Sequence, residues 1–368
     1  MDIRPYLKLM ADKDASDLFF SVGAPPTIKV QGHALPVGKV PLQAADVRTL
    51  LDAMTDEAQK AEFERELELN LAMAVDGVGR FRVNAYRQRG DIALVIRYIK
   101  TRIPSLEELQ LPSLLATLVM EPRGLILVVG ATGSGKSTTL AAMIDHRNTH
   151  RDGHILTIEE PIEYVHQHKK SIVDQREIGL DTHSYANALK NAMREAPDVI
   201  LIGEIRDRDT MQHAIAYAET GHLCLATLHA NNANQAVDRI INFLPDSAHH
   251  QLLIDLAQNL RAVISQRLIP ALDGRRVPAV EIMLKSSYVS DLIEKRQIDL
   301  LKETIEKSRD SGMQTFDQSL YDLCISGRIS EEQALANADS RNNLAVQFRL
   351  GKGARAEGSG DGLTMTRD

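Results

Sequence analysis

Residues 124–137, GLILVVGATGSGKS, decide the fold of this chain. The unbroken apolar run at 124–129 is typical of a strand that is buried on both faces of a parallel sheet. The segment from Gly130 to Ser137 fits the pattern G-x-x-x-x-G-K-[ST] in full. Its glycines let successive backbone N–H groups turn toward phosphate oxygens, and the helix that follows adds the positive end of its dipole. The stretch therefore predicts a strand, a phosphate-binding loop and a helix in direct succession.

Individual residues of this loop have predicted roles in nucleotide binding. Lys136 offers a mobile cation to the β- and γ-phosphates, and Ser137 offers a hydroxyl to Mg²⁺. The loop by itself predicts ATP or GTP together with Mg²⁺ as the bound cofactors. The other predicted nucleotide-binding positions are Gly130, Ala131, Thr132, Gly133, Ser134, Gly135 and Thr138.

Two acidic segments follow apolar strands downstream of the loop. Residues 155–164, ILTIEEPIEY, contain three glutamates that include Glu163, and residues 198–207, DVILIGEIRD, end a strand in Gly-Glu at Glu204. Hydrolysis needs one carboxylate to orient or deprotonate water and a second for metal-bound water. Ligands of open α/β sheets bind at the carboxyl ends of strands, so both placements suit catalysis. The alternative for either segment alone is a solvated acidic loop.

A third segment, residues 220–232 (TGHLCLATLHANN), carries two histidines. An imidazole can donate a hydrogen bond to a γ-phosphate oxygen, which makes His222 and His229 candidates for nucleotide contact. The alternative is structural: His222 would cap a helix end, and His229 would satisfy a buried carbonyl group.

The region before the loop predicts a small α+β domain at residues 1–100. Residues 81–99 alternate apolar and polar positions as a hairpin does, with Arg-Gly-Asp at 89–91 as its turn. Residues 46–71 have helical spacing, with Asp46 as the expected N-cap. Two prolines, at 104 and 112, predict a stiff linker over residues 101–112.

The region from 113 to 350 predicts an α/β domain. Short apolar strands at 125–129, 154–158, 199–202 and 223–228 alternate with helices, which indicates a parallel sheet covered by helices. After about residue 245 the pattern becomes mostly helical, beginning with one helix over 246–266. The last residues, 351–368, are Gly-rich and polar, and we expect them to be disordered.

Composition restricts the class of protein without defining its chemistry. The chain has 368 residues and a formal net charge of −7, which argues against a dedicated DNA-binding protein with a basic surface. Two cysteines exclude a disulfide framework and a four-cysteine zinc site. No apolar run reaches the 18 or so residues of a membrane span, so we expect no direct membrane insertion and a cytoplasmic protein.

The four motifs in their order resemble the secretion-ATPase superfamily and, within it, the type IV pilus retraction ATPases. Residues 16–19 (SDLF) and 79–83 (GRFRV) also resemble the PAS-like N-terminal domain of that family. The resemblance covers roughly residues 1–345. It implies a PAS-like domain at 1–100 and a RecA-like ATPase domain at 113–350 that hydrolyses ATP with Mg²⁺.

The resemblance also implies roles for individual residues. Glu163 would activate water, Glu204 would act on Mg²⁺ through water, and His229 and His222 would lie near the γ-phosphate. Family members form hexameric rings in which arginines of the N-terminal domain complete a neighbour's site, as an arginine in trans does in other phosphoryl transfers. Our candidates are Arg82 and Arg97, followed by Arg80 and Arg87, and the alternative is that these are exposed hairpin charges.

One segment separates two branches of the retraction family. The main motor, PilT, carries Ala-Ile-Arg-Asn-Leu-Ile-Arg-Glu, whereas residues 288–295 here read YVSDLIEK and keep neither arginine. Residues 229–245 and 312–323 resemble the accessory branch instead. The implied partners are further copies in a hexamer, PilT, and a PilC-like platform protein of the inner membrane, with no nucleic acid. The alternatives are a force-relaying subunit with weak hydrolysis and a nucleic-acid motor.

Overall fold

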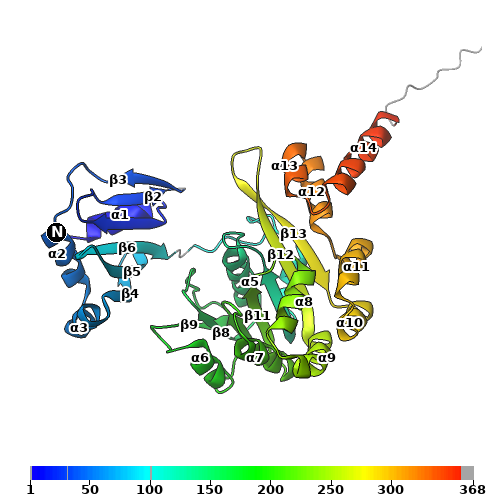
Figure 1. Ribbon diagram of the computed structural model, residues 1–368, viewed down its shortest axis with the longest axis horizontal. Helices are drawn as coiled ribbons and strands as arrows, with labels where there is room; N and C mark the ends of the chain where they lie inside the picture. Colours follow the sequence, from blue (N-terminus) through cyan, green and yellow to red (C-terminus); the bar gives the residue numbers. More distant parts are fainter. Residues whose placement is uncertain (1, 31, 100–101, 358–368) are drawn as a thin grey trace, which may run out of the picture. The chain divides into compact units, whose positions relative to one another are not determined.

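A computed structural model describes residues 2–30, 32–99 and 102–357, with side chains up to residue 350. Its contacts divide the chain into two compact units (Figure 1). The first unit is Met1–Ile103 together with Pro161–His166 and Gly179–His183. The second unit is Pro104–Glu160, Gln167–Ile178 and the chain from Ser184 onward. Each unit contains one sheet, and the α+β and α/β classes predicted for the two regions are confirmed.

The first unit is built on a six-stranded antiparallel sheet with the order β3-β2-β1-β6-β5-β4. Its strands are β1 (Asp17–Ser21), β2 (Thr27–Val30), β3 (His33–Pro36), β4 (Glu68–Val75), β5 (Gly79–Gln88) and β6 (Asp91–Ile99). Its helices are α1 (Arg4–Asp12), α2 (Ala44–Met54) and α3 (Glu57–Glu66). Apolar side chains from the sheet and from these helices form one core.

The predicted hairpin at 81–99 is confirmed as β5 and β6. Phe81, Val83 and Ala85 point to the same face and are fully buried. The turn consists of Arg89 and Gly90, which both have positive φ values of 50° and 85°. Two residues with positive φ match the twist of the flanking strands, which explains why glycine occupies this tip.

The single helix predicted over 46–71 is wrong. Asp46 lies in the third position of α2 and accepts a hydrogen bond from the backbone N–H of Gln43, which is the N-cap. The helix ends at Met54 because Asp56 starts a new one, its carboxylate accepting the N–H of Gln59 at 2.8 Å. From Glu68 onward buried and exposed side chains alternate, which is the period of strand β4.

The predicted linker, residues 101–112, differs from the structure in its second part. The second unit begins at Pro104, and residues 100 and 101 lie outside the described part of the chain. Leu106 and Leu111 are buried and belong to the same core as helix α4 (Leu114–Val119). The segment from 104 to 112 is therefore packed against the core of the second unit, because its leucines remove apolar surface from water.

The second unit contains a seven-stranded sheet with the order β13-β12-β7-β11-β10-β8-β9. All neighbours pair in parallel except β12 and β13, which form an antiparallel hairpin. The strands are β7 (Gly124–Val129), β8 (Gly153–Glu159), β9 (Ser171–Glu177), β10 (Val199–Ile202), β11 (Leu223–Leu228), β12 (Leu260–Pro270) and β13 (Arg276–Leu284).

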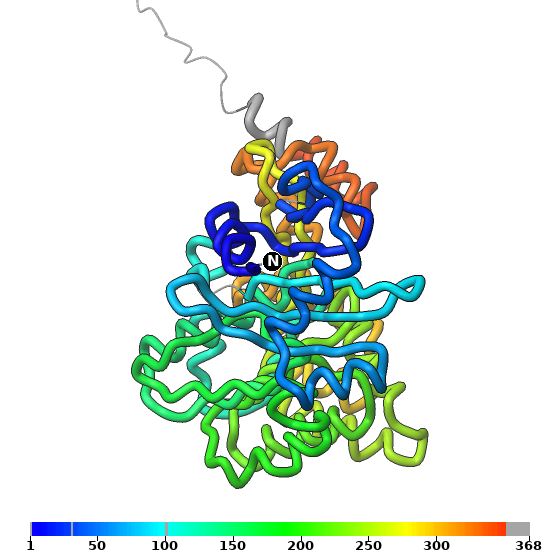
Figure 2. Tube along the Cα trace, turned by 90° about the vertical axis from the view of Figure 1, so that its left-hand side faces the viewer, coloured from blue at the N-terminus to red at the C-terminus, as the bar shows by residue number. Residues whose placement is uncertain are grey.

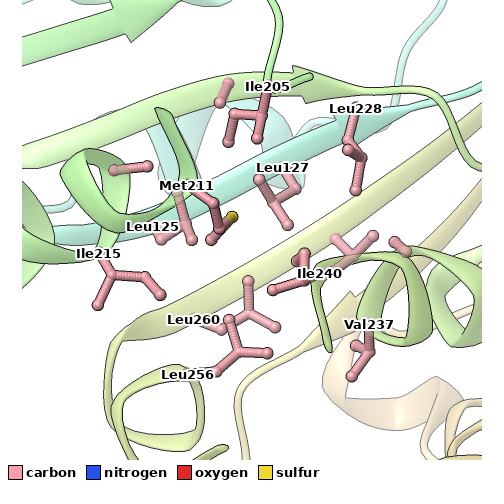
Figure 3. Close-up of a cluster of buried hydrophobic side chains, with 14 of the residues drawn as sticks. Leu125, Leu127, Ile205, Met211, Ile215, Leu228, Val237, Ile240, Leu256 and Leu260 are labelled. Atoms are coloured by element: carbon pink, nitrogen blue, oxygen red, sulfur yellow. The ribbon is translucent and has the colours of Figure 1, made fainter. Parts of the chain in front are cut away.

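Helices cover both faces of this sheet. Ile126 and Val128 of β7 point to the face covered by α4 and α5 (Lys136–His150). Leu125 and Leu127 point to the opposite face, where they pack against the helices that follow the acidic segments (Figure 3). Those helices are α6 (Tyr185–Ala192), α7 (Arg208–Glu219), α8 (Ala233–Asn242) and α9 (His249–Asn259). The strand at 124–129 thus lies at the centre of the fold.

The prediction of one helix over 246–266 is wrong, and the hairpin that follows it was missed. Helix α9 ends at Asn259, and residues from Leu260 to Pro270 form β12 instead. Strand β12 lies between two other strands of the sheet, and its residues 262–266 are all buried. The sequence therefore lacks the alternation of apolar and polar residues that would indicate a strand. Strand β9 was missed as well. It is an edge strand of the sheet, and its buried Ser171 and Val173 are followed by the exposed Asp174.

The C-terminal part is helical, as predicted. Its last helices, from Phe316 onward, lie beside the β12–β13 hairpin (Figure 2). Phe316 and Leu320 share a buried cluster with Ile269 and Val277 of the hairpin. Helix α14 extends to Glu357, so the disorder predicted for 351–368 is wrong for 351–357, and 358–368 lie outside the described residues. The helices are α10 (Ser287–Glu294), α11 (Leu301–Lys307), α12 (Phe316–Ile325), α13 (Glu331–Asn337) and α14 (Arg341–Glu357).

Within the described residues, no helix is long and apolar enough to cross a membrane.

Candidate active site

The phosphate loop connects β7 to α5 in the predicted strand–loop–helix order. A Cβ atom on Gly130 would lie 2.6 Å from the backbone oxygen of Gln266, and one on Gly135 would lie 2.7 Å from the side-chain nitrogen of the same glutamine. Both glycines also have positive φ, 154° and 93°. Larger residues would collide there, so the loop can keep its tight curve only with glycine at these two positions.

The polar side chains of the loop gather at the start of α5. The Nζ atom of Lys136 donates to the carbonyl oxygens of Gly130 and Ala131, at 3.0 and 3.1 Å, so the ammonium lies over the loop. Ser137 and Thr138 follow in the first helical turn and are half-buried. The Oγ atom of Ser134 is buried and has no hydrogen-bond partner among the described residues. The loop thus combines a positive ammonium group and hydroxyl groups, which are the donors that phosphate oxygens accept from.

The parallel strands bring two of the predicted site residues to the same edge of the sheet as the loop. Strand β10 ends at Ile202, after which Gly203 and Glu204 follow, and β11 ends at Leu228, after which His229 follows. In the register Leu228 is paired with Val129, the last residue before the loop. Carboxyl ends of parallel strands are where open α/β sheets bind ligands, and the structure meets that expectation here.

Glu204 and His229 are in direct contact. The Nε2 atom of His229 lies 3.0 Å from Oε1 of Glu204, whose side chain is 19% exposed. The other carboxylate oxygen of Glu204 accepts a hydrogen bond from Nε of Arg206 at 2.9 Å, and Arg206 also contacts Glu160 at 2.9 Å. The alternative that His229 satisfies a buried carbonyl group is thus wrong for its ring. His229, Glu204, Arg206 and Glu160 thus form one series of contacts at the edge of the sheet where the loop lies.

Arg206 is a member of this cluster that the sequence reasoning passed over. The hydrogen bond that Arg206 donates to Glu204 raises the pKa of Arg206, so the guanidinium stays charged. It holds two carboxylates near each other that would otherwise repel. The signal was available in the sequence, because an arginine two residues after Glu204 extends from the same strand end.

His222 does not join this cluster. Its backbone oxygen accepts the N–H of Gly124, so it lies beside the first residue of β7, whereas the loop follows the last. A six-residue strand is about 20 Å long, and this distance separates His222 from the loop of its own subunit. Its Nδ1 atom lies 3.2 Å from the carbonyl oxygen of Tyr217 and 3.1 Å from the hydroxyl of Thr220, at the end of α7. These contacts agree with the alternative in which His222 caps the end of a helix.

Glu163 groups with the first unit, whereas Glu204 and His229 belong to the second. It lies on an exposed segment after β8. The structure therefore does not bring Glu163 together with Glu204 within one unit, and its role as the residue that activates water stays a prediction.

The candidate arginines differ in their surroundings. Arg82 on β5 is the cross-strand neighbour of Arg97 on β6, and Arg97 is 62% exposed while its Nε lies 3.0 Å from the buried Asp17. Arg87 is held by Glu64 at 2.7 Å and lies over the ring of Phe63. Arg82 and Arg97 thus lie side by side on neighbouring strands, and Arg97, like Arg87, has a carboxylate partner within its own unit. Arg80 is exposed near the start of β5. That any of them acts on a neighbouring subunit's nucleotide stays a prediction.

Fold and site together define a RecA-like P-loop nucleotide-binding protein with an additional N-terminal α+β domain. The family model described as "Type II/IV secretion system protein" matches residues 66–322. The chain is 51% identical to the type IV pilus ATPase PilU of Pseudomonas aeruginosa over 97% of this chain and 94% of that protein. It is 41% identical to PilT of the same organism over 94% of this chain and 100% of PilT.

Comparison with solved structures gives the same answer. The crystal structure of the pilus retraction motor PilT with bound ADP superposes with a TM-score of 0.88 at 39% identity, covering 94% of this chain and 99% of that one. The chain therefore belongs to the type II/IV secretion system protein family. The predicted resemblance to the retraction ATPases is confirmed.

Substitution of Arg206 by alanine is expected to lower kcat for ATP hydrolysis about tenfold, with KM changed by less than about twofold. The change removes a charge-assisted hydrogen bond of the kind worth about 1.5–3 kcal/mol when partly buried, and it leaves Glu204 free to rotate. Steady-state kinetics of the purified variant test this expectation. Arg48→Ala is the matched control, because Arg48 also contacts two carboxylates, Asp52 and Glu64, and is similarly exposed. Equal losses in both variants would contradict a role for Arg206 at the site.

Proposed function

We propose that this protein is a hexameric ATPase that hydrolyses ATP to power or assist the retraction of type IV pili, as an accessory to the main motor PilT. The observation that carries the proposal is the phosphate loop with the Glu204–His229 pair at the same sheet edge. The identity of 51% to PilU over nearly the whole chain supports the biological setting.

In this proposal the loop binds the nucleotide phosphates. Backbone N–H groups from Gly130 to Ser137 surround the β-phosphate, and Lys136 exchanges its carbonyl partners for phosphate oxygens. The residues fit Mg²⁺ as well, because Ser137 offers a hydroxyl in the first turn of α5 and Glu204 follows β10 at the same edge of the sheet. Ser137 would hold the ion directly and Glu204 through water, and the ion would neutralise charge on the phosphates.

The remaining residues act on the reacting groups. Glu163 accepts a proton from the attacking water, and His229 donates a hydrogen bond toward the γ-phosphate while Glu204 orients its ring. Arg82 and Arg97 of a neighbouring subunit stabilise the charge that develops on the transferred group. Each step needs a side chain in a fixed position. The hydrogen bonds that Arg206 donates to Glu204 and Glu160 hold these two carboxylates in place.

The partners follow from the same family relationship. Further copies of this chain complete a ring, PilT works beside it, and a PilC-like platform protein of the inner membrane receives the motion. The protein is expected to be cytoplasmic and peripheral to the inner membrane through these contacts. A net charge of −7 supports the absence of nucleic acid among its partners.

A second candidate function is a force-relaying subunit with little hydrolysis of its own. It is favoured by the segment 288–295, which lacks the arginines of the PilT motif and forms α10 with Tyr288 56% exposed. The two functions differ in one measurable property, since only the first requires ATP turnover by this chain.

A deletion experiment tests the proposal. Removing the gene alone is expected to leave pilus retraction largely intact, whereas removing it in cells whose PilT cannot hydrolyse ATP is expected to abolish retraction. Cells in which only PilT hydrolysis is disabled separate the two candidates, because a motor would still drive retraction there, whereas a passive relay would have no ATP turnover to relay. Complementing the double strain with Glu204→Gln should restore retraction under neither candidate. Retraction that is unchanged in every strain would contradict both candidates, and hydrolysis that is stimulated by DNA would point to a nucleic-acid motor.

A further inference from the structure

Strand β12 places one buried glutamine against the phosphate loop. Strand β12 runs parallel to β7, and Ser265 is paired with Val129, so Gln266 stands level with Gly130. Its side chain is in the buried interior, with 3% of the residue exposed. The glutamine therefore adjoins the loop from a strand that lies more than a hundred residues further along the chain.

Gln266 contacts both ends of the loop and the helix that follows. Its carboxamide oxygen accepts a hydrogen bond from the hydroxyl of Thr139 at 2.7 Å, in the first turns of α5. Its carboxamide nitrogen lies 2.7 Å from the point where a Cβ on Gly135 would be, and its backbone oxygen lies 2.6 Å from the corresponding point at Gly130. One residue thus adjoins the beginning of the loop, its end and the first turns of α5.

We propose that Gln266 is a positioning residue that sets the curvature of the phosphate loop. Because the Thr139 hydroxyl is bound to the oxygen of the planar amide, the amide nitrogen is turned toward Gly135. The loop is held in the shape in which its N–H groups and Lys136 face the phosphates. This inference rests on the proposed function only in that the loop binds ATP.

The neighbouring residue of β12 has a different task, which makes the inference specific. Successive side chains of a strand point to opposite faces, and Ser265 points away from the loop. Its hydroxyl donates to the buried Glu281 at 3.1 Å, and Glu281 accepts the N–H of Ala233 at the start of α8. Ser265 therefore supports the helix that follows His229, whereas Gln266 supports the loop. Loss of either side chain disturbs β12, but only loss of Gln266 should weaken ATP binding.

Calorimetric titration of the full-length chain with ATP, together with steady-state hydrolysis, tests the inference. Gln266→Met keeps length and flexibility but removes the amide. We expect it to raise Kd and KM for ATP about tenfold, equivalent to about 1.4 kcal/mol, with kcat changed less than about twofold. Thr139→Val should raise Kd by about fivefold, and the double variant should bind no more weakly than Gln266→Met, because both changes break one hydrogen-bonded unit.

Three control variants make the result decisive. Ser265→Ala disturbs the same strand and should leave the Kd for ATP unchanged. Thr304→Val makes the same substitution as Thr139→Val at a buried helical threonine distant from the loop, and it should change neither Kd nor kcat. Gln266→Glu keeps an acceptor for Thr139 but replaces the amide nitrogen with negative charge, so it should bind ATP more weakly than Gln266→Met.

Several outcomes would overturn the inference. They are an unchanged Kd in Gln266→Met, additive losses in the double variant, or an equal loss in Ser265→Ala. If Gln266→Met does not fold, as thermal unfolding would show, Thr139→Val and Gln266→Glu still decide the matter through their Kd values. A wild-type chain that binds ATP but does not hydrolyse it would contradict the proposed motor function and leave the comparison of Kd values valid.

Discussion

Replacing Lys136 with alanine is expected to reduce ATP hydrolysis by at least about a thousandfold and to weaken ATP binding severely. The ammonium group lies over the loop, bound to the carbonyl oxygens of Gly130 and Ala131. A single lost charge that stabilises a phosphoryl-transfer transition state can cost a factor of 10³ or more, about 4 kcal/mol. The measurement is the rate of phosphate release at saturating ATP.

The control for Lys136→Ala is Lys60→Ala in the N-terminal unit. Lys60 also makes one close polar contact, at 2.7 Å to Glu57, so the control removes a lysine with a partner but away from the loop. It should retain the wild-type rate. Hydrolysis by Lys136→Ala at even a tenth of the wild-type rate would show that the loop is not where ATP reacts.

Replacing Glu204 with glutamine is expected to lower kcat about a hundredfold to a thousandfold while leaving the Kd for ATP within about threefold of the wild type. The amide has nearly the same shape, so packing is preserved, but the charge that orients His229 and engages Arg206 is gone. A loss confined to kcat is the mark of an interaction that matters in the transition state rather than in binding.

Glu195→Gln is the matched control for Glu204→Gln. Glu195 is a partly buried glutamate in the same unit that contacts an arginine, Arg176, at 2.7 Å. The control should retain hydrolysis close to the wild-type rate. If Glu204→Gln hydrolyses ATP as fast as Glu195→Gln, the assignment of Glu204 is wrong.

The sequence was sufficient for the part of the site that depends on strand ends. The loop, Glu204 and His229 each directly follow an apolar strand, and parallel pairing forces such positions to one edge. The same rule places His222, which precedes its strand, at the opposite end of β11. Strand direction thus predicts the position of each of these residues, while their roles toward a nucleotide stay predictions.

The sequence was insufficient where burial removes the pattern. Strand β12 is paired on both edges and its residues 262–266 are all buried, so this part of the strand shows no alternation and its pattern predicts the end of a helix over 246–266. With the strand missed, Gln266 could not be placed beside Gly130. The break between α2 and α3 was missed for a different reason, since Asp56 acts as a cap within a stretch that keeps helical spacing. Pairing between strands that are distant in the sequence explains the first difference, and helix capping by Asp56 explains the second.

The place of β12 in the sheet has a consequence for how the protein is made. The hydrogen bond between Thr139 and Gln266 joins residues that are 127 positions apart in the chain. Closing so large a loop of chain is slow compared with forming the helices between its ends. On the ribosome, the phosphate loop emerges long before the glutamine that supports it. A nascent chain that ends between Ser137 and Gln266 therefore carries the complete nucleotide-binding motif without its supporting glutamine.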